Sequence, residues 1–138
     1  MATIHQARKA VVGLLYAYDL GNSDILKFVD TILEEKKIRN KKRLFSYELF
    51  NGTIDNLETI DNIIYRNLKD WEYDYIGKVE KAIIRLAVYE MIIDKKDSKI
   101  VINEAIELSK DLADEKAPKF INALLDHIYK NEGKEHAS

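Results

Sequence analysis

The sequence has no cysteine, only one proline and only five glycines in 138 residues. Without cysteine, the chain forms no disulfide and no thiolate zinc site, so nothing indicates a secreted scaffold. The scarcity of proline and glycine argues against many short strands joined by tight turns. No apolar run approaches the roughly 20 residues that span a membrane, and the N-terminus lacks a signal-peptide core. These absences favour a single cytoplasmic domain.

Apolar residues recur every three or four positions along most of the chain, as in helices with one buried face. The first stripe follows Thr3 and Gln6, which are spaced as in a capping box, and Gly21 fits its C-terminal cap. We therefore predict an all-α fold with six to seven helices in a compact bundle. The other stripes lie in residues 25–33, 44–68, 79–91, 102–108 and 120–128.

Residues 1–130 are predicted to form one helical domain, and residues 131–138 a polar, frayed tail. The segment 44–68 is either one bent helix or two, with Gly52 as its softest point. The stripes place Ile4, Phe28 and Leu44 on buried faces. Asn103 and Asn122 stand beside apolar residues, so we expect their amides to be buried and bonded to a neighbouring backbone.

The sequence contains no recognisable catalytic constellation. None of its histidines, His5, His127 and His136, follows a glutamate in the Glu-x-x-His spacing of di-metal helical bundles. The glycines form no phosphate-binding loop, and no nucleophile elbow is present. We therefore predict a protein that is not an enzyme, carries no metal or cofactor, and acts by binding.

The charge distribution is uneven although the net charge is only −2. Residues 1–50 hold nine basic and six acidic side chains, whereas residues 51–138 hold thirteen basic and eighteen acidic ones. A basic half and an acidic half on one small domain suggest two different partners. Ordinary scatter of surface charge is the simpler explanation when the asymmetry is taken alone.

The first helix has a second face that carries His5, Arg8, Lys9 and Tyr16. Basic side chains can contact phosphates, and a tyrosine ring can stack on an unpaired base, so this face is a candidate RNA-binding surface. The alternative is a solvated helix with one exposed tyrosine. The segment 36–43 has six basic residues in eight. It either extends an RNA path or forms a solvated loop, and the solvated loop is somewhat favoured.

Two acidic residues of the segment 78–91, Glu80 and Glu90, interrupt its apolar stripe. Intrahelical ion pairs do not account for them, and Lys81 repels Arg85 at a spacing of four. Glu80 and Glu90 are therefore candidate anchors for a basic protein partner.

The second half of the chain resembles the NusB family. The resemblance is carried by KVEKAIIRLAVYEM (78–91), INEAIELSK (102–110) and KFINALLD (119–126), and nearer the N-terminus by Arg8 and Leu15-Tyr16 with Tyr18. Ile4, His5 and Gln6 stand where the family often has arginine. Fewer phosphate contacts would make RNA binding by this chain alone weaker and less sensitive to salt.

The resemblance implies two helical subdomains and a function in transcription antitermination on ribosomal RNA operons. Members of the family bind a boxA-type RNA element together with the ribosomal protein NusE, and join other Nus factors on RNA polymerase. The resemblance also places Lys116, Lys119 and Phe120 at the RNA surface beside the first helix, although periodicity favours a core position for Phe120. Glu80 matches an acidic position of the family that helps to bind NusE.

Two alternatives remain. One is the RNA-binding module of an RNA methyltransferase, which a chain of this length disfavours because it leaves no room for a cofactor-binding domain. The other is a helical adaptor that binds only proteins. The oligomeric state is left open by the sequence.

Overall fold

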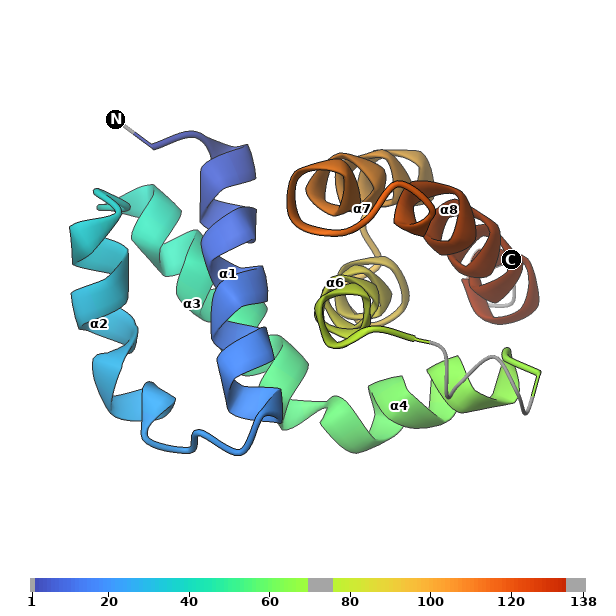
Figure 1. Ribbon diagram of the computed structural model, residues 1–138, viewed down its shortest axis with the longest axis horizontal. Helices are drawn as coiled ribbons and strands as arrows, with labels where there is room; N and C mark the ends of the chain where they lie inside the picture. Colours follow the sequence, from blue (N-terminus) through green and yellow to red (C-terminus); the bar gives the residue numbers. More distant parts are fainter. Residues whose placement is uncertain (1, 70–75, 134–138) are drawn as a thin grey trace.

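The computed structural model describes residues 2–69 and 76–133, and this part of the chain contains helices and no strand (Figure 1). The prediction of an all-α bundle of six to seven helices is confirmed. Seven α-helices and two π-helical segments are described: α1 (Ile4–Asp19), α2 (Ile25–Glu35), α3 (Lys41–Asp55), α4 (Leu57–Arg66), α6 (Lys78–Val88), η1 (Tyr89–Ile93), α7 (Ser98–Leu112), α8 (Ala117–Ile128) and η2 (Tyr129–Gly133).

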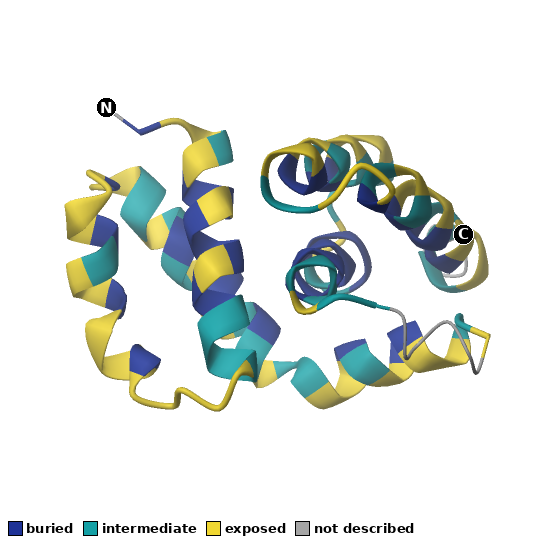
Figure 2. Cartoon of the chain, in the orientation of Figure 1, coloured by how far each residue is buried: buried dark blue, intermediate teal, exposed yellow. Residues whose placement is uncertain are grey.

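The helices form two groups that meet along α1 and α6. Helices α1, α2 and α3 pack together on one side and α6, α7 and α8 on the other, while α4 continues from the end of α3 and runs beneath the second group (Figure 1). Helix α1 contacts both α3 and α6, so it lies at the junction of the two groups. The buried faces of the helices turn toward this junction, while the outer faces of α2 and α4 are exposed (Figure 2).

Both ends of α1 are set by local sequence. The Gln6 N–H donates to Thr3 Oγ1 at 3.0 Å and the Thr3 N–H donates to Gln6 Oε1 at 2.8 Å, which is a complete capping box. At the other end, Gly21 has a φ of +90°, and the Asn22 N–H reaches back to the Ala17 carbonyl at 3.3 Å. This is the glycine C-terminal motif that the sequence predicts.

The long segment 44–68 is two helices, and the break falls at Asn56 and not at Gly52. The Asn56 side-chain amide donates to the Gly52 carbonyl at 2.7 Å and so competes with continuation of the helix. Gly52 lies inside α3 for a different reason. A Cβ at this position would come within 2.2 Å of the Tyr89 ring, so glycine allows α3 to approach η1.

Five side chains expected in the interior lie on the surface, and one of them, Ile4 in the first turn of α1, is 41% exposed. Phe28 is 51% exposed and Leu44 60% exposed. Helix α2 buries only the narrow row Ile25, Val29 and Leu33, because it packs at the edge of the bundle. Leu44 lies in the first turn of α3.

Asn103 and Asn122 are also exposed, so the predicted buried amides are wrong. On α7, Asn103 is two residues from each of Val101 and Ala105, which are buried. A two-residue step on a helix turns about 200°, so Asn103 must face away from them. The same argument places Asn122 opposite the buried Leu124.

The chain end packs against α4 within the described residues. Of the tail 131–138, residues 131–133 belong to η2, and the remaining residues lie outside the described part. Glu132 accepts hydrogen bonds from Arg66 Nε at 2.8 Å and from Asn67 Nδ2 at 2.9 Å. Within residues 2–69 and 76–133, no helix has both the length and the apolar character required to cross a membrane.

Candidate nucleic-acid interface

The candidate RNA-binding face of α1 divides into exposed and buried residues. Lys9 is exposed, while His5 and Tyr16 are half-buried. Arg8 is only 8% exposed. Tyr16 follows Lys9 by about two helical turns, roughly 10 Å along the axis. Of the three basic side chains on this face, Lys9 is therefore the one whose charge is open to solvent.

Arg8 and Glu90, which the sequence assigns to two different partners, bond to each other inside the bundle. Arg8 Nη2 donates to Glu90 Oε1 at 2.9 Å and Arg8 Nε to Oε2 at 3.1 Å. Lys96 Nζ donates to the same Oε1 at 2.8 Å, and Glu90 is only 2% exposed. Direct contact of either Arg8 or Glu90 with a separate partner would require this pair to open.

The Phe45 ring completes the same cluster. The Arg8 guanidinium carbon lies 5.2 Å from the ring centroid and Lys96 Nζ lies 5.0 Å from it, so both cations contact its π-system. The cluster joins α1, α3 and η1. No local pattern reveals it, because Arg8 and Glu90 are 82 residues apart.

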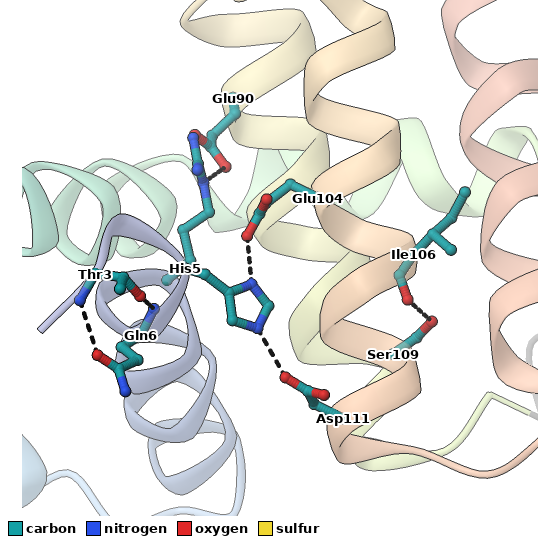
Figure 3. Close-up of polar contacts among 9 residues, drawn as sticks. Thr3, His5, Gln6, Glu90, Glu104, Ile106, Ser109 and Asp111 are labelled. Carbon is teal, nitrogen blue, oxygen red and sulfur yellow. Dashed lines mark hydrogen bonds and ion pairs between the residues drawn. The ribbon is translucent and has the colours of Figure 1, made fainter.

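His5 joins α1 to α7 (Figure 3). Its Nδ1 lies 2.6 Å from Glu104 Oε1 and its Nε2 lies 2.7 Å from Asp111 Oδ2. Carboxylates only accept hydrogen bonds, so a ring bonded at both nitrogens must be the doubly protonated imidazolium. Hydrogen bonds to Asp111 and Glu104 raise the pKa of His5 above its ordinary 6.5, and the bond to His5 lowers the pKa of Asp111.

The His5 contacts should make the stability of the bundle depend on pH. A folded-state pKa above the unfolded value means that the stabilisation is fully present below pH about 6.5 and disappears as the pH rises through the raised value. We expect the difference in free energy of unfolding between the wild type and His5→Gln to shrink as the pH rises from about 6 to about 9. Urea unfolding at a series of pH values measures this, and a difference constant over that range would contradict it.

The lysines at the start of α8 follow the end of α7 that bonds to α1. The His5–Asp111 bond holds the C-terminal end of α7 against α1, and the α7–α8 connection follows at once (Figure 1). Lys116 and Lys119 are both exposed there. The Asp114 carboxylate accepts from the Lys116 and Ala117 N–H groups at 2.9 and 3.1 Å, which fixes the start of the helix.

Phe120 is half-buried and packs against the core. Its partly exposed ring also lines a cavity of about 360 Å³ between α8 and the end of α4. Periodicity favours a core position, and a half-buried ring is compatible both with packing and with contact to a bound base.

The two candidate anchors for a protein partner occupy different settings. Glu80 is half-buried in the first turn of α6, where a negative charge stabilises the helix N-terminus. A Cβ on Gly77 would meet the Glu80 carboxylate at 1.8 Å, which shows that this side chain folds back over the helix start. Glu90 is enclosed in the Arg8 cluster.

Sequence reasoning missed a second buried charge cluster at the other end of α1. Arg85 is 7% exposed and donates to Asp61 at 2.9 and 2.7 Å and to Asp19 Oδ1 at 2.9 Å. Lys81 Nζ also lies 3.9 Å from Asp19. The repulsive spacing of Lys81 and Arg85 was the available signal, because two cations on one face need carboxylates from elsewhere in the fold.

Comparison with known proteins identifies the family to which the chain is similar. The NusB family model matches residues 5–130. The chain is 65% identical over 130 residues to the transcription antitermination protein NusB of Sulfurovum sp. (strain NBC37-1), covering 94% of this chain and 100% of that protein. It is 61% identical over 130 residues to the protein of the same name from Aliarcobacter butzleri (strain RM4018), covering 94% and 99%.

Solved structures show the same fold. The crystal structure of the antitermination factors NusB and NusE in complex with dsRNA superposes with a TM-score of 0.82 at 34% identity, covering 92% of this chain and 96% of that one. The solution structure of NusB from Aquifex aeolicus gives a TM-score of 0.81 at 35% identity, covering 98% and 93%. The chain belongs to the NusB family.

Proposed function

We propose that this chain is a transcription antitermination factor that binds a boxA-type RNA element together with the ribosomal protein NusE during transcription of ribosomal RNA operons. Other Nus factors and RNA polymerase would be engaged through this complex. Support comes from the close relatives named as antitermination proteins and from the solved NusB–NusE–dsRNA relative. The chain would act in the cytoplasm by binding and not by catalysis.

The observation that carries the RNA-binding proposal is that exposed lysines stand on two distant segments that are linked through α7. Lys9 comes from α1, and Lys116 and Lys119 come from the start of α8, while the His5–Asp111 bond holds α1 against the end of α7 that precedes α8. Such lysines can contact phosphates, and the half-exposed rings of Tyr16 and Phe120 can stack on unpaired bases. His5 and Arg8 would position α1 for this contact.

The protein partner would bind the surface that includes Glu80 on α6. Residues 51–138 carry an excess of acidic side chains, which complements a basic ribosomal protein. Glu90 would contribute through the position of η1, because its carboxylate is already bonded to Arg8. RNA and protein surfaces that are individually weak gain affinity when both partners are joined, since the second contact becomes intramolecular.

The test is binding of a boxA RNA and a scrambled RNA, each with and without NusE, measured by fluorescence anisotropy. We expect preference for boxA in the presence of NusE. Replacing Lys9, Lys116 and Lys119 together by glutamine should weaken boxA binding roughly tenfold or more, because the variant can no longer bind three phosphates. A control with Lys27, Lys78 and Lys130 replaced by glutamine removes the same charge from exposed sites elsewhere.

One result would contradict the proposed function, and another would contradict only the role of these lysines. The absence of any boxA preference in both conditions would exclude the antitermination function. Equal RNA binding by the test and control variants would leave a boxA function in place but remove these lysines from it. The adaptor alternative predicts that NusE binds the wild type and that no RNA does.

A further inference from the structure

A large cavity lies beside the N-terminal end of α1, on the side away from α7. It occupies about 900 Å³ between the start of the chain and the α2–α3 connection. Pockets that enclose a drug-sized organic molecule have volumes of about 300–1,000 Å³. The cavity is therefore large enough to receive a nucleotide unit, and the residues at its edge determine which ligand it can hold.

The lining carries an excess of positive charge. Four basic residues line it, Lys37, Arg39, Lys41 and Lys42, and no acidic residue does within the described chain. Arg39 is compensated by Glu34 at 2.9 Å. Hydrogen bonds from Arg43 and from Arg39 lower the pKa of Glu34, so its carboxylate stays ionised. Lys37, Lys41 and Lys42 have no carboxylate within ion-pair distance among the described residues, which leaves three uncompensated charges around one cavity.

These lysines are held by a folded connection and not by a free loop. Ile38 is fully buried between them, and its N–H donates to the Leu33 carbonyl at 2.9 Å. Arg43 Nε donates to the Ile38 carbonyl at 3.0 Å. Lys41 and Lys42 lie in the first turn of α3, whose N-terminus has no side-chain cap, so the helix dipole adds to the positive potential. This anchoring distinguishes the segment from the solvated loop that composition alone favours.

Apart from Asn40, the remaining wall is apolar. Ala2, Ile4 and Phe45 line this part of the cavity, and Ile4 is 41% exposed. Cationic side chains next to an apolar surface match the chemistry of a nucleotide, which combines an anionic phosphate with a flat, weakly polar base. An acidic peptide would use the charges but would leave this wall without a partner.

The cavity lies next to the N-terminal end of α1. Ala2 and Ile4 of its wall flank Thr3, which caps α1, and His5 follows directly. Figure 1 shows the N-terminal end of α1 between the α2–α3 connection and α7. An RNA strand that crosses this end of α1 from the α7–α8 connection would therefore reach the cavity.

We propose that the cavity binds a nucleotide of single-stranded RNA beyond the boxA element, with Lys37, Lys41 and Lys42 contacting its phosphates. The inference rests on the proposed RNA-binding function and extends it. The RNA path would run from the start of α8 across the N-terminal end of α1 to the α2–α3 connection. It assigns a role to the basic segment 36–43.

The test compares a minimal boxA RNA with the same RNA extended by several uridines at its 5′ or its 3′ end. Anisotropy titrations with the protein and NusE should show tighter binding of one extended RNA, by roughly tenfold. Replacing Lys37, Lys41 and Lys42 together by glutamine should abolish that gain and leave affinity for the minimal RNA unchanged. The log–log slope of affinity against salt for the extended RNA should become shallower by about 0.7 for each phosphate that the variant no longer binds.

The control is the variant with Lys27, Lys78 and Lys130 replaced by glutamine, which should keep the full gain. Circular dichroism melts of both variants check that they fold. The inference is overturned if the wild type gains nothing from either extension, if the Lys37/Lys41/Lys42 variant retains the gain, or if that variant loses the same affinity for both RNAs. Failure of the proposed function has a different signature, which is no boxA preference by the wild type at any length.

Discussion

Glu90→Gln is expected to lower the free energy of unfolding by about 3–5 kcal/mol, because it leaves the Arg8 guanidinium buried without its counter-charge. The side chains of Arg8 and Glu90 are only 10% and 3% exposed, so water cannot replace the missing carboxylate. For a domain of this size the loss of stability corresponds to a fall in melting temperature of roughly 10–20 °C. Urea unfolding and thermal melts followed by circular dichroism measure both quantities.

A double variant separates the charge effect from packing. Arg8→Met combined with Glu90→Met removes both charges and keeps apolar volume, and such replacements of buried pairs are often close to neutral. Lys96 is 32% exposed at its side chain and can turn its ammonium group to solvent. We therefore expect the double variant to be more stable than Glu90→Gln. A double variant that is less stable than the single one would show that the contacts with the Phe45 ring matter more than charge compensation.

The second large effect is expected for Arg85→Met, which should cost about 2–4 kcal/mol of stability. The change leaves two carboxylates, Asp19 and Asp61, without the cation that binds both. Their side chains are 16% and 27% exposed, so solvent moderates the penalty relative to the Arg8 cluster. Asp19 Oδ2 is buried without a hydrogen-bond partner in the described chain even when Arg85 is present, which makes this site sensitive to any further change.

Lys81→Met is the matched control on the same helix. Lys81 Nζ lies 3.9 Å from Asp19, and its side chain is 22% exposed. A longer and more solvated ion pair contributes about 1 kcal/mol or less. Chemical denaturation of the two variants side by side should therefore give a clearly lower free energy of unfolding for Arg85→Met than for Lys81→Met. Equal stability of the two would mean that Arg85 is held for a reason other than its two carboxylates.

The Arg8 and Arg85 clusters hold α1 in place. Arg8 and Arg85 sit at interfaces that involve α1, one near its start and one through Asp19 at its end. Together with His5 they tie α1 to α6, η1 and α7. The proposed RNA surface consists of residues from α1 and α8, so its geometry depends on these interactions although few of the residues would touch RNA. Variants that weaken the clusters should bind RNA less tightly because α1 is no longer held in place.

Much of the fold follows from local pattern. The capping box at Thr3, the glycine motif at Gly21 and the proline at the start of α8 are short-range features that act within one turn. Apolar periodicity identifies the helices because each must bury one face. The same reasoning misplaced Phe28 and Leu44, because periodicity shows which face is apolar but not how wide the covered face is.

The sequence by itself determined the helical class, both ends of α1 and the resemblance to the family, since these depend on residues that are close in the chain. Only the tertiary structure decided which charges are available to partners. Arg8, His5 and Glu90 have the composition of a binding surface, yet each meets an opposite charge from a helix far away in sequence. Lys9, Lys37 and Lys119 remain open to solvent. Whether a charged side chain binds RNA or stabilises the fold depends on which groups the fold brings beside it, and those distances are set only when the helices pack.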